Sequence, residues 1–246
     1  MNPRHAEILR LVNESKRVMV ADLSVITSVS EVTIRQDLSA LEEQGYIKRV
    51  HGGAILIEND DIDLRMEVNF EIKQKLASIA ADLVEPNESV LIGGGSANAL
   101  LARKLADRGD VIIITPSAYI AHLIRNSRVD IILLGGVYQH QGENLVGSLT
   151  KYCIEHIHFS TAFFGIDGYH QDTGFTNRDM MRADIAAAIV AKNKRNIVLT
   201  DFSKFGLIYP STMCKERDVT TLITNYTTQS KDIEFLKSQG IEVLLG

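Results

Sequence analysis

Apolar and polar residues alternate with the spacing of α-helices over the first part of the chain. One helix is expected over about residues 3–14, and a second over about residues 20–27. The apolar face of the first helix is formed by Ile8, Leu9 and Val12.

A third helix is predicted to begin after Ser30. The hydroxyl of a serine at this position can accept a hydrogen bond from a backbone N–H that the first helical turn leaves unpaired. Ile34, Leu38 and Leu41 then recur at the spacing of one buried helix face. Gly45 is typical of the residue that ends a helix.

After this helix the pattern of apolar and polar residues changes from the helical spacing to the alternation of a strand. Residues 46–50 alternate apolar and polar side chains, which predicts a short half-buried strand. Lys48 and Arg49 lie in that strand and are followed by a tight turn at residues 51–53. A third helix followed by a hairpin with a basic tip is the pattern of a winged helix-turn-helix.

A helix of this kind fits the major groove of B-DNA, where its N-terminal side chains reach the edges of the bases. Arg35 suits guanine and Gln36 suits adenine, whereas the carboxylate of Asp37 would repel phosphates and is expected to form a structural pair. For an isolated helix, a solvated polar face would be the better interpretation; the preceding helices and the wing favour DNA. The candidate DNA contacts are Ser30, Thr33, Arg35, Gln36, Lys48, Arg49 and His51.

An acidic, polar run at residues 58–63 marks the expected domain boundary. A helical pattern then extends over residues 65–84. The predicted organisation is a DNA-binding domain over 1–57, a linker and connecting helix over 58–75, and an α/β domain over 76–246.

The remainder of the chain contains short apolar runs rich in β-branched residues, with helical stretches between several of them. Continuous apolar runs, rather than alternating ones, indicate strands covered on both faces, so a largely parallel sheet is expected. The expected strands are residues 89–92, 111–114, 131–134, 162–166, 197–200, 222–224 and 242–245, and the expected helices include 97–106, 118–126 and 179–192.

Composition adds few constraints. Apolar residues make up 45% of the 246 and charged residues 23%, which are ordinary values for a globular protein. The sequence has no apolar run of membrane-spanning length and no export signal, so a cytoplasmic location is expected. Cys153 and Cys214 lack metal-binding spacing, and neither a metal nor a cofactor is predicted.

The formal net charge of −5 is unusual for a protein that binds DNA. Residues 1–57 contain seven basic and seven acidic side chains, so the acidic excess belongs to the rest of the chain. DNA affinity depends on where cations are placed, so this balance predicts modest affinity for each subunit. A homo-oligomer is therefore expected.

Small and polar residues follow several of the expected strands, where ligands bind in open α/β sheets. After the first of these strands come Gly-Gly-Gly-Ser-Ala-Asn at 93–98 and a helix, an arrangement that can bind an anion. One such turn could serve packing alone, and Asp201 and Lys204 could form only a surface salt bridge. Because small and polar residues follow several strands and not one alone, we predict a polar pocket for a small anion.

At this point the chain resembles a known family. V-S-E-V-T-I-R-Q-D-L followed by R-V-H-G-G-A is similar to the signature of the DeoR family of bacterial transcription regulators, and L-L-G-G, G-I-D-G, T-G-F-T and D-F-S-K-F-G are similar to its sensor-domain motifs. The resemblance implies a sensor domain related in fold to ribose-5-phosphate isomerase that binds a phosphorylated sugar or derivative. It also implies that Gly95 and Ser96 lie at the phosphate and that Asp167 and Lys204 lie in the pocket. The candidate effector contacts are Gly95, Ser96, Asn98, Gly135, Asp167, Gly168, Thr176 and Lys204.

Two alternatives to a ligand-controlled regulator remain open, and the first follows from two departures from the family pattern. The family's first loop usually carries an Asp and a second hydroxyl where this chain has Gly93 and Ala97, so a sensor that has lost its ligand is one alternative. A second is a sugar-phosphate isomerase with Asp167 and Lys204 as acid–base candidates. An isomerase has no evident use for a winged helix, and the favoured hypothesis is a repressor of a carbohydrate-catabolism operon.

Overall fold

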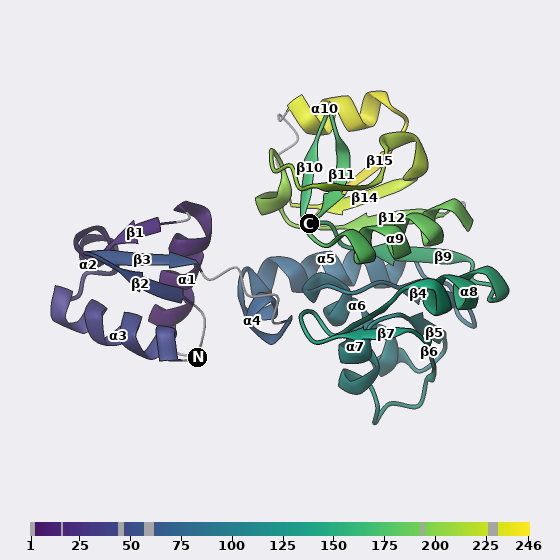
Figure 1. Cartoon of the computed structure of the whole chain (residues 1–246), viewed down its shortest axis with the longest axis horizontal. Coiled ribbons are helices and arrows are strands. Elements are labelled where there is room, and N and C mark those ends of the chain that lie inside the picture. Colours follow the sequence, from purple (N-terminus) through teal and green to yellow (C-terminus); the bar gives the residue numbers. More distant parts are fainter. Residues whose placement is uncertain (1–2, 16, 44–46, 57–61, 193–194, 226–230) are drawn as a thin grey trace. The chain divides into compact units, whose positions relative to one another are not determined.

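The computed structural model describes residues 3–15, 17–43, 47–56, 62–192, 195–225 and 231–246. The chain divides into two compact units, residues 1–69 and 70–246 (Figure 1). The predicted winged helix-turn-helix and the predicted parallel α/β domain are both confirmed.

Among its described residues, the first unit contains three helices, a small sheet and a fourth short helix. The three strands form an antiparallel sheet in the order β1-β3-β2. The elements are α1 (Pro3–Ser15), β1 (Arg17–Met19), α2 (Val20–Thr27), α3 (Glu31–Glu43), β2 (Ile47–Val50), β3 (Gly53–Leu56) and α4 (Ile62–Glu67).

One apolar core holds the first unit together. The apolar faces predicted for the first and third helices are buried in it, together with Leu23 of α2 and Ile47 of β2. Each such side chain contributes about 1.5–3 kcal/mol when it is fully buried. The strand β1 was not predicted, because three residues are too few to show a period.

The helix predicted over residues 65–84 is in fact two helices. The first, α4, ends at Glu67, and α5 (Phe70–Asp82) begins three residues later. Asn69 lies between them with a φ of 57°, a left-handed conformation that interrupts an α-helix and that asparagine tolerates better than most residues. The division between the two units falls at this residue, inside the stretch predicted as linker and connecting helix.

The second unit is built on a seven-stranded sheet in which every pairing is parallel, in the order β15-β14-β12-β9-β4-β5-β6. All seven strands were predicted to within one or two residues at most ends. They are β4 (Ser89–Ile92), β5 (Ile112–Thr115), β6 (Asp130–Leu133), β9 (Thr161–Phe164), β12 (Asn196–Leu199), β14 (Thr221–Thr224) and β15 (Glu242–Leu245).

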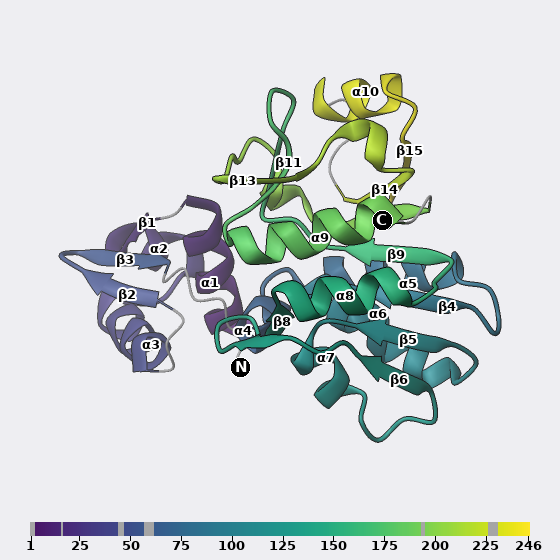
Figure 2. The ribbon, with the colours of Figure 1, turned by 45° about the vertical axis from the view of Figure 1, so that its right-hand side comes forward.

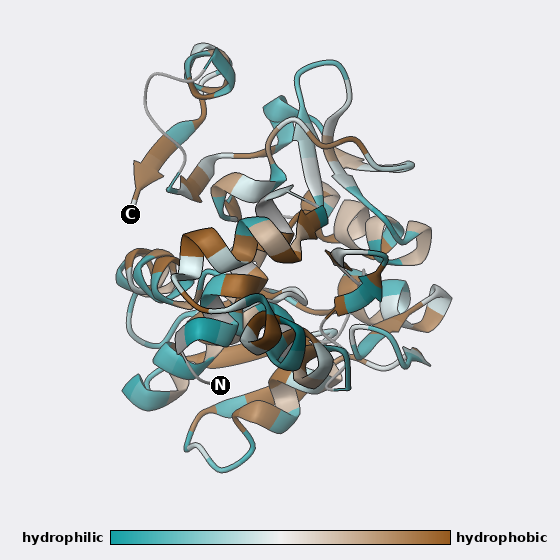
Figure 3. Ribbon diagram, turned by 90° about the vertical axis from the view of Figure 1, so that its left-hand side faces the viewer, coloured by the Kyte–Doolittle hydropathy of each residue, from teal (hydrophilic) through white to brown (hydrophobic). Residues whose placement is uncertain are grey.

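Helices cover both faces of this sheet, as the continuous apolar runs require. Figure 2 shows α8 and α9 on one face and α5 and α6 on the other. The buried core of this unit is apolar, and Figure 3, coloured by hydropathy, shows the last strand in the brown of apolar residues where it ends at the C-terminus. The helices are α6 (Ser96–Arg108), α7 (Ala118–Leu123), α8 (Ser148–His156), α9 (Met180–Lys192) and α10 (Lys231–Ser238).

Two smaller antiparallel sheets were not predicted. The strands of one lie in the order β10-β11-β13, and the other is the hairpin of β7 and β8. Each strand has three or four residues of mixed polarity. The elements are β7 (Val137–Gln139), β8 (Asn144–Val146), β10 (Gly168–His170), β11 (Gly174–Asn177) and β13 (Ser211–Cys214), with 3₁₀ turns η1 (Phe202–Lys204) and η2 (Glu216–Asp218).

Candidate functional site

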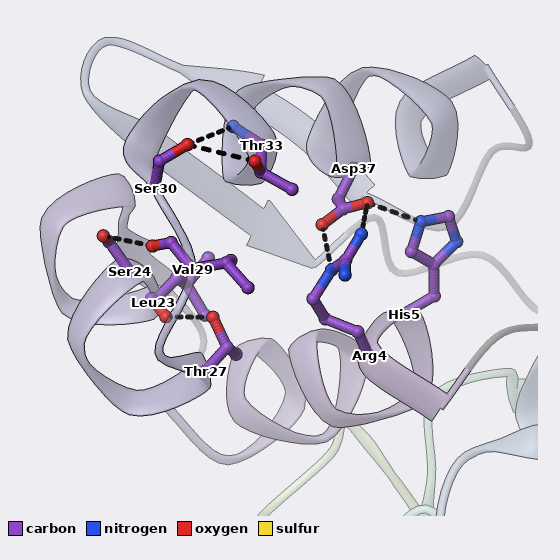
Figure 4. A network of polar contacts seen from close by, with 9 residues as sticks. All are labelled: Arg4, His5, Leu23, Ser24, Thr27, Val29, Ser30, Thr33 and Asp37. Carbon is purple, nitrogen blue, oxygen red and sulfur yellow. Dashed lines mark hydrogen bonds and ion pairs between the residues drawn. The ribbon is translucent and has the colours of Figure 1, made fainter.

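Local hydrogen bonds fix the turn that leads into α3. Ser28 adopts a left-handed φ of 56° after α2, and the Ser24 hydroxyl donates to the carbonyl oxygen of Val29 at 2.6 Å (Figure 4). The backbone N–H of Thr33 donates to Oγ of Ser30 at 3.3 Å. Ser30 is therefore the N-cap of α3, as its sequence position predicts.

Asp37 clamps α3 to α1. Its carboxylate accepts hydrogen bonds from Arg4 Nε at 2.6 Å and Arg4 Nη2 at 3.0 Å, and Nε2 of His5 lies 3.0 Å from the same group (Figure 4). The hydrogen bond from Arg4 is the main cause that lowers the pKa of Asp37 below its usual value. The structural role predicted for Asp37 is thus confirmed, and the carboxylate is kept away from the outer face of the helix.

This clamp predicts an acid dependence for the first unit. Because folding lowers the pKa of Asp37, its stabilisation is present above the pKa of the unfolded chain and is lost as pH falls through the lower folded value. We expect Asp37→Asn to lower the stability of this unit by about 1–2 kcal/mol at pH 7, after allowance for the partial exposure of Arg4. Thermal unfolding measured from pH 7 to pH 3 should show that the variant loses less stability in acid than the wild type. Equal losses of stability in the two proteins would contradict the role assigned to Asp37.

The predicted DNA contacts on α3 differ in how far they are already engaged. Thr33 hydrogen-bonds Ser30, and Arg35 forms an exposed ion pair with Glu31 at 2.7 Å. Gln36 is exposed, and its side chain makes no hydrogen bond to any residue that the structure describes. All the predicted contacts on this helix lie outside the core of the unit.

The predicted wing is present, and all three of its basic candidates are exposed. Lys48 and Arg49 lie on β2, and His51 lies in the turn that follows. The guanidinium of Arg49 donates to the hydroxyl of Ser39 on α3 at 2.7 Å, which ties the wing to the helix. Exposed cations beside an exposed helix are what binding to the phosphate backbone requires.

In the second unit, the topology of the sheet singles out one place for a ligand. From β4 the chain adds β5 and β6 on one side, and then returns to add β9, β12, β14 and β15 on the other. Ligands of open α/β sheets bind beyond the carboxyl ends of the strands at such a switch point. Here those ends carry the loop 93–95 after β4, the loop 165–167 after β9 and the turn 201–204 after β12.

The loop after β4 has the geometry of an anion site. Gly95 precedes α6 with a φ of 119°, and no atom lies within 4 Å of the position that a side chain would occupy. Ser96 begins the helix, and its hydroxyl makes no hydrogen bond to any described residue. The first backbone N–H groups of a helix have no partner within it and favour negative charge.

The side chain of Asn98 holds this loop in place through hydrogen bonds. Its side-chain nitrogen donates to the carbonyl oxygens of Gly93 at 3.0 Å and Gly94 at 3.3 Å. These bonds occupy the amide donor that was predicted to contact an effector, so in this structure Asn98 braces the loop.

Three further predicted contacts belong to the backbone framework of the site. Thr176 donates from its hydroxyl to the carbonyl oxygen of Gly168 at 3.1 Å and so closes the β10–β11 hairpin. A side chain at Gly168 would overlap the carbonyl oxygen of Leu207. Gly135 accepts a hydrogen bond from the Thr150 hydroxyl at 2.7 Å.

Asp167 follows β9 and is buried. Its carboxylate accepts a hydrogen bond from the backbone N–H of Arg178 at 3.1 Å. The guanidinium of Arg178 lies 4.6 Å from the centre of the Tyr209 ring and donates to its hydroxyl at 2.8 Å. Arg178 was not predicted, because it follows an unpredicted strand.

Asp201 and Lys204 form a charge cluster with a third residue. Burial would by itself raise the pKa of Asp201, but the ammonium groups of Lys204 and Lys73, together with hydrogen bonding from Ser203, hold it below the usual value. Asp201 is 3% exposed and Lys73 on α5 is 5% exposed. Sequence reasoning missed Lys73, although it lies one helical turn from Ala77 and two turns from Ala80 on the buried face of α5.

Comparison with known proteins finds a matching family model for each of the two units. Residues 4–60 match the model of the DeoR-like helix-turn-helix domain, and residues 68–226 match that of the DeoR C-terminal sensor domain. The chain belongs to the DeoR family. It is a DNA-binding transcription regulator rather than an enzyme. The relatives that it matches are named as transcription regulators or repressors, and the match covers most of the length of each.

Two relatives and one solved structure illustrate the similarity. The HTH-type transcriptional regulator GolR of Listeria innocua is 31% identical over 90% of this chain and 89% of its own. The putative aga operon transcriptional repressor of Escherichia coli O157:H7 is 26% identical over 98% and 93%. Ribose 5-phosphate isomerase A from Methanocaldococcus jannaschii has a TM-score of 0.42 and 22% identity, covering 56% of this chain and 55% of its own.

Within the described residues, no group of His, Cys, Asp and Glu is arranged to hold a metal ion. The helices of that part of the chain include none with the length and apolar character needed to cross a membrane.

Proposed function

We propose that this regulator represses an operon for carbohydrate catabolism and responds to a phosphorylated sugar or sugar derivative. The observation that carries the proposal is the convergence of three loops at the switch point between β4 and β9. They bring the Ser96 hydroxyl, which makes no hydrogen bond to a described residue, a helix N-terminus and the half-buried Lys204 to the carboxyl ends of three adjacent strands.

Each group has a separate role in this proposal. The backbone of Gly95 and the hydroxyl of Ser96 bind the phosphate, since both are suited to close approach by an anion. Lys204 supplies the compensating positive charge, and Asp167 faces the sugar hydroxyls. Asn98, Gly135, Gly168 and Thr176 hold the loops in position.

We further propose that the regulator acts in the cytoplasm as a homo-oligomer. The first unit has no net charge over residues 1–57, so two copies on paired half-sites would supply affinity that one lacks. Exposed apolar side chains on β6, β7 and α8 support self-association of the second unit. They are Ile132, Leu133, Val137, Leu149 and Tyr152.

Thermal unfolding of the full chain with a panel of sugar phosphates tests the ligand proposal. A ligand at 100 times its Kd stabilises the folded state by about 2.7 kcal/mol, so the melting temperature should rise by several degrees. We expect Lys204→Met to abolish this rise and Lys75→Met, an exposed lysine on α5, to keep it. The same sugars without phosphate should have no effect. A rise that survives in Lys204→Met would overturn the proposed site.

A further inference from the structure

The outward face of α3 is defined by what lies opposite the core. Ile34, Leu38 and Leu41 are all completely buried. With 3.6 residues per turn, Val32 and Gln36 are one turn apart on the side away from that buried stripe. Val32 is 63% exposed, although full burial of a valine side chain would contribute about 1.5–3 kcal/mol.

The polar side chains around this pair are engaged with one another. Ser30 and Thr33 are hydrogen-bonded through their hydroxyl oxygens at 3.0 Å. Arg35 is paired with Glu31, four residues before it. Among these N-terminal positions of α3, Gln36 is exposed without a hydrogen bond or ion pair to another described residue, and Val32 is an exposed apolar side chain one turn before it.

The chemistry of the two free side chains matches one kind of base pair. The amide of glutamine can make paired hydrogen bonds with N6 and N7 of adenine, and apolar side chains contact the 5-methyl group of thymine. Four residues of helix span about 6 Å, close to two base steps of about 3.4 Å each. A helix placed in the major groove can therefore apply both side chains to A·T pairs that lie two base steps apart.

We infer that Val32 is a specificity-determining residue of this regulator and contacts the 5-methyl group of a thymine two base steps from the adenine bound by Gln36. The inference rests on the DNA-binding function of α3. It adds an apolar residue to the polar candidates on this helix.

A single exposed valine is common on protein surfaces, so the test must remove one methyl group at a time. A preferred duplex is first selected from a random-sequence library with the full-length protein. Each thymine is then replaced by uracil, which deletes only the 5-methyl group, and affinities are measured for the wild type, Val32→Ala and Val25→Ala. Val25 on α2 is 79% exposed and serves as the matched control.

We expect uracil at one position to weaken wild-type binding about four-fold, the equivalent of about 0.8 kcal/mol for one buried methyl group. Val32→Ala should bind the thymine duplex at least as weakly as the wild type binds the uracil duplex, and should be indifferent to uracil there. Val25→Ala should behave as the wild type.

Identical uracil penalties in the wild type and Val32→Ala would overturn the inference while leaving DNA binding intact. Selection of no sequence by the wild-type protein would instead refute sequence-specific binding, and the inference would fall with it.

Discussion

Asp201→Ala is expected to lower the free energy of unfolding of the second unit by about 3–5 kcal/mol, because it leaves the buried ammonium of Lys73 without this carboxylate. The variant also loses the hydrogen bond of 2.9 Å that Asp201 accepts from the backbone of Ser203 in η1. Chemical denaturation of the full chain, followed by a signal of the second unit, measures the loss.

Two further variants separate charge from packing. The double variant Lys73→Met with Asp201→Asn removes both charges, so it should be more stable than the sum of the two single changes predicts. Asp107→Ala, at an exposed position of α6, should change stability by no more than about 0.5 kcal/mol. A change that small in Asp201→Ala would show that the cluster contributes little to the fold.

Gly53→Ala is expected to reduce DNA affinity at least ten-fold. A side chain at Gly53 would overlap the backbone carbonyl oxygen of Val18, so β3 must move away from β1 and displace the wing. The overlapping atom belongs to the backbone and cannot rotate aside, and overpacking of this kind costs about 1–3 kcal/mol.

Affinity for the selected duplex, measured by fluorescence anisotropy, reports the effect on the wing. The melting of the second unit in the same sample is the internal control and should not change, since the substitution lies in the other unit. Wild-type affinity in Gly53→Ala would mean that the wing takes no part in binding.

The sequence is most informative where burial imposes a pattern. All seven strands of the parallel sheet could be predicted, because strands covered on both faces are continuously apolar. Ser30 as a helix cap and Asp37 as a structural carboxylate could also be predicted, because each follows from the chemistry of one side chain next to a helix.

Features that depend on contacts between distant residues could not be predicted. The strands β10, β11 and β13 are defined by their pairing across the chain, and their few residues show no period. The role of Lys73 depends on Asp201, which is more than 120 positions later. Asn98 has the polarity of a ligand contact, and only the structure shows that its amide is bonded to the loop.

The pairing of Glu31 with Arg35 could be predicted from the sequence only in part. An acidic residue four positions before a basic one is a recognised helix pair and could have been found in the sequence. Only the structure shows that Gln36, on the outward face, has no hydrogen-bond partner among the described residues and that Val32 beside it is exposed.

The central claim is that the second unit changes the DNA affinity of the first when an anionic sugar binds at the switch point of the sheet. The most direct measurement is the anisotropy of the selected duplex bound to the full chain, during titration with the sugar phosphate that stabilises the protein. We expect the ligand to release the DNA from the wild type and not from Lys204→Met, since a ligand acts only through different affinities for the two states. Unchanged DNA affinity at saturating ligand would contradict the account.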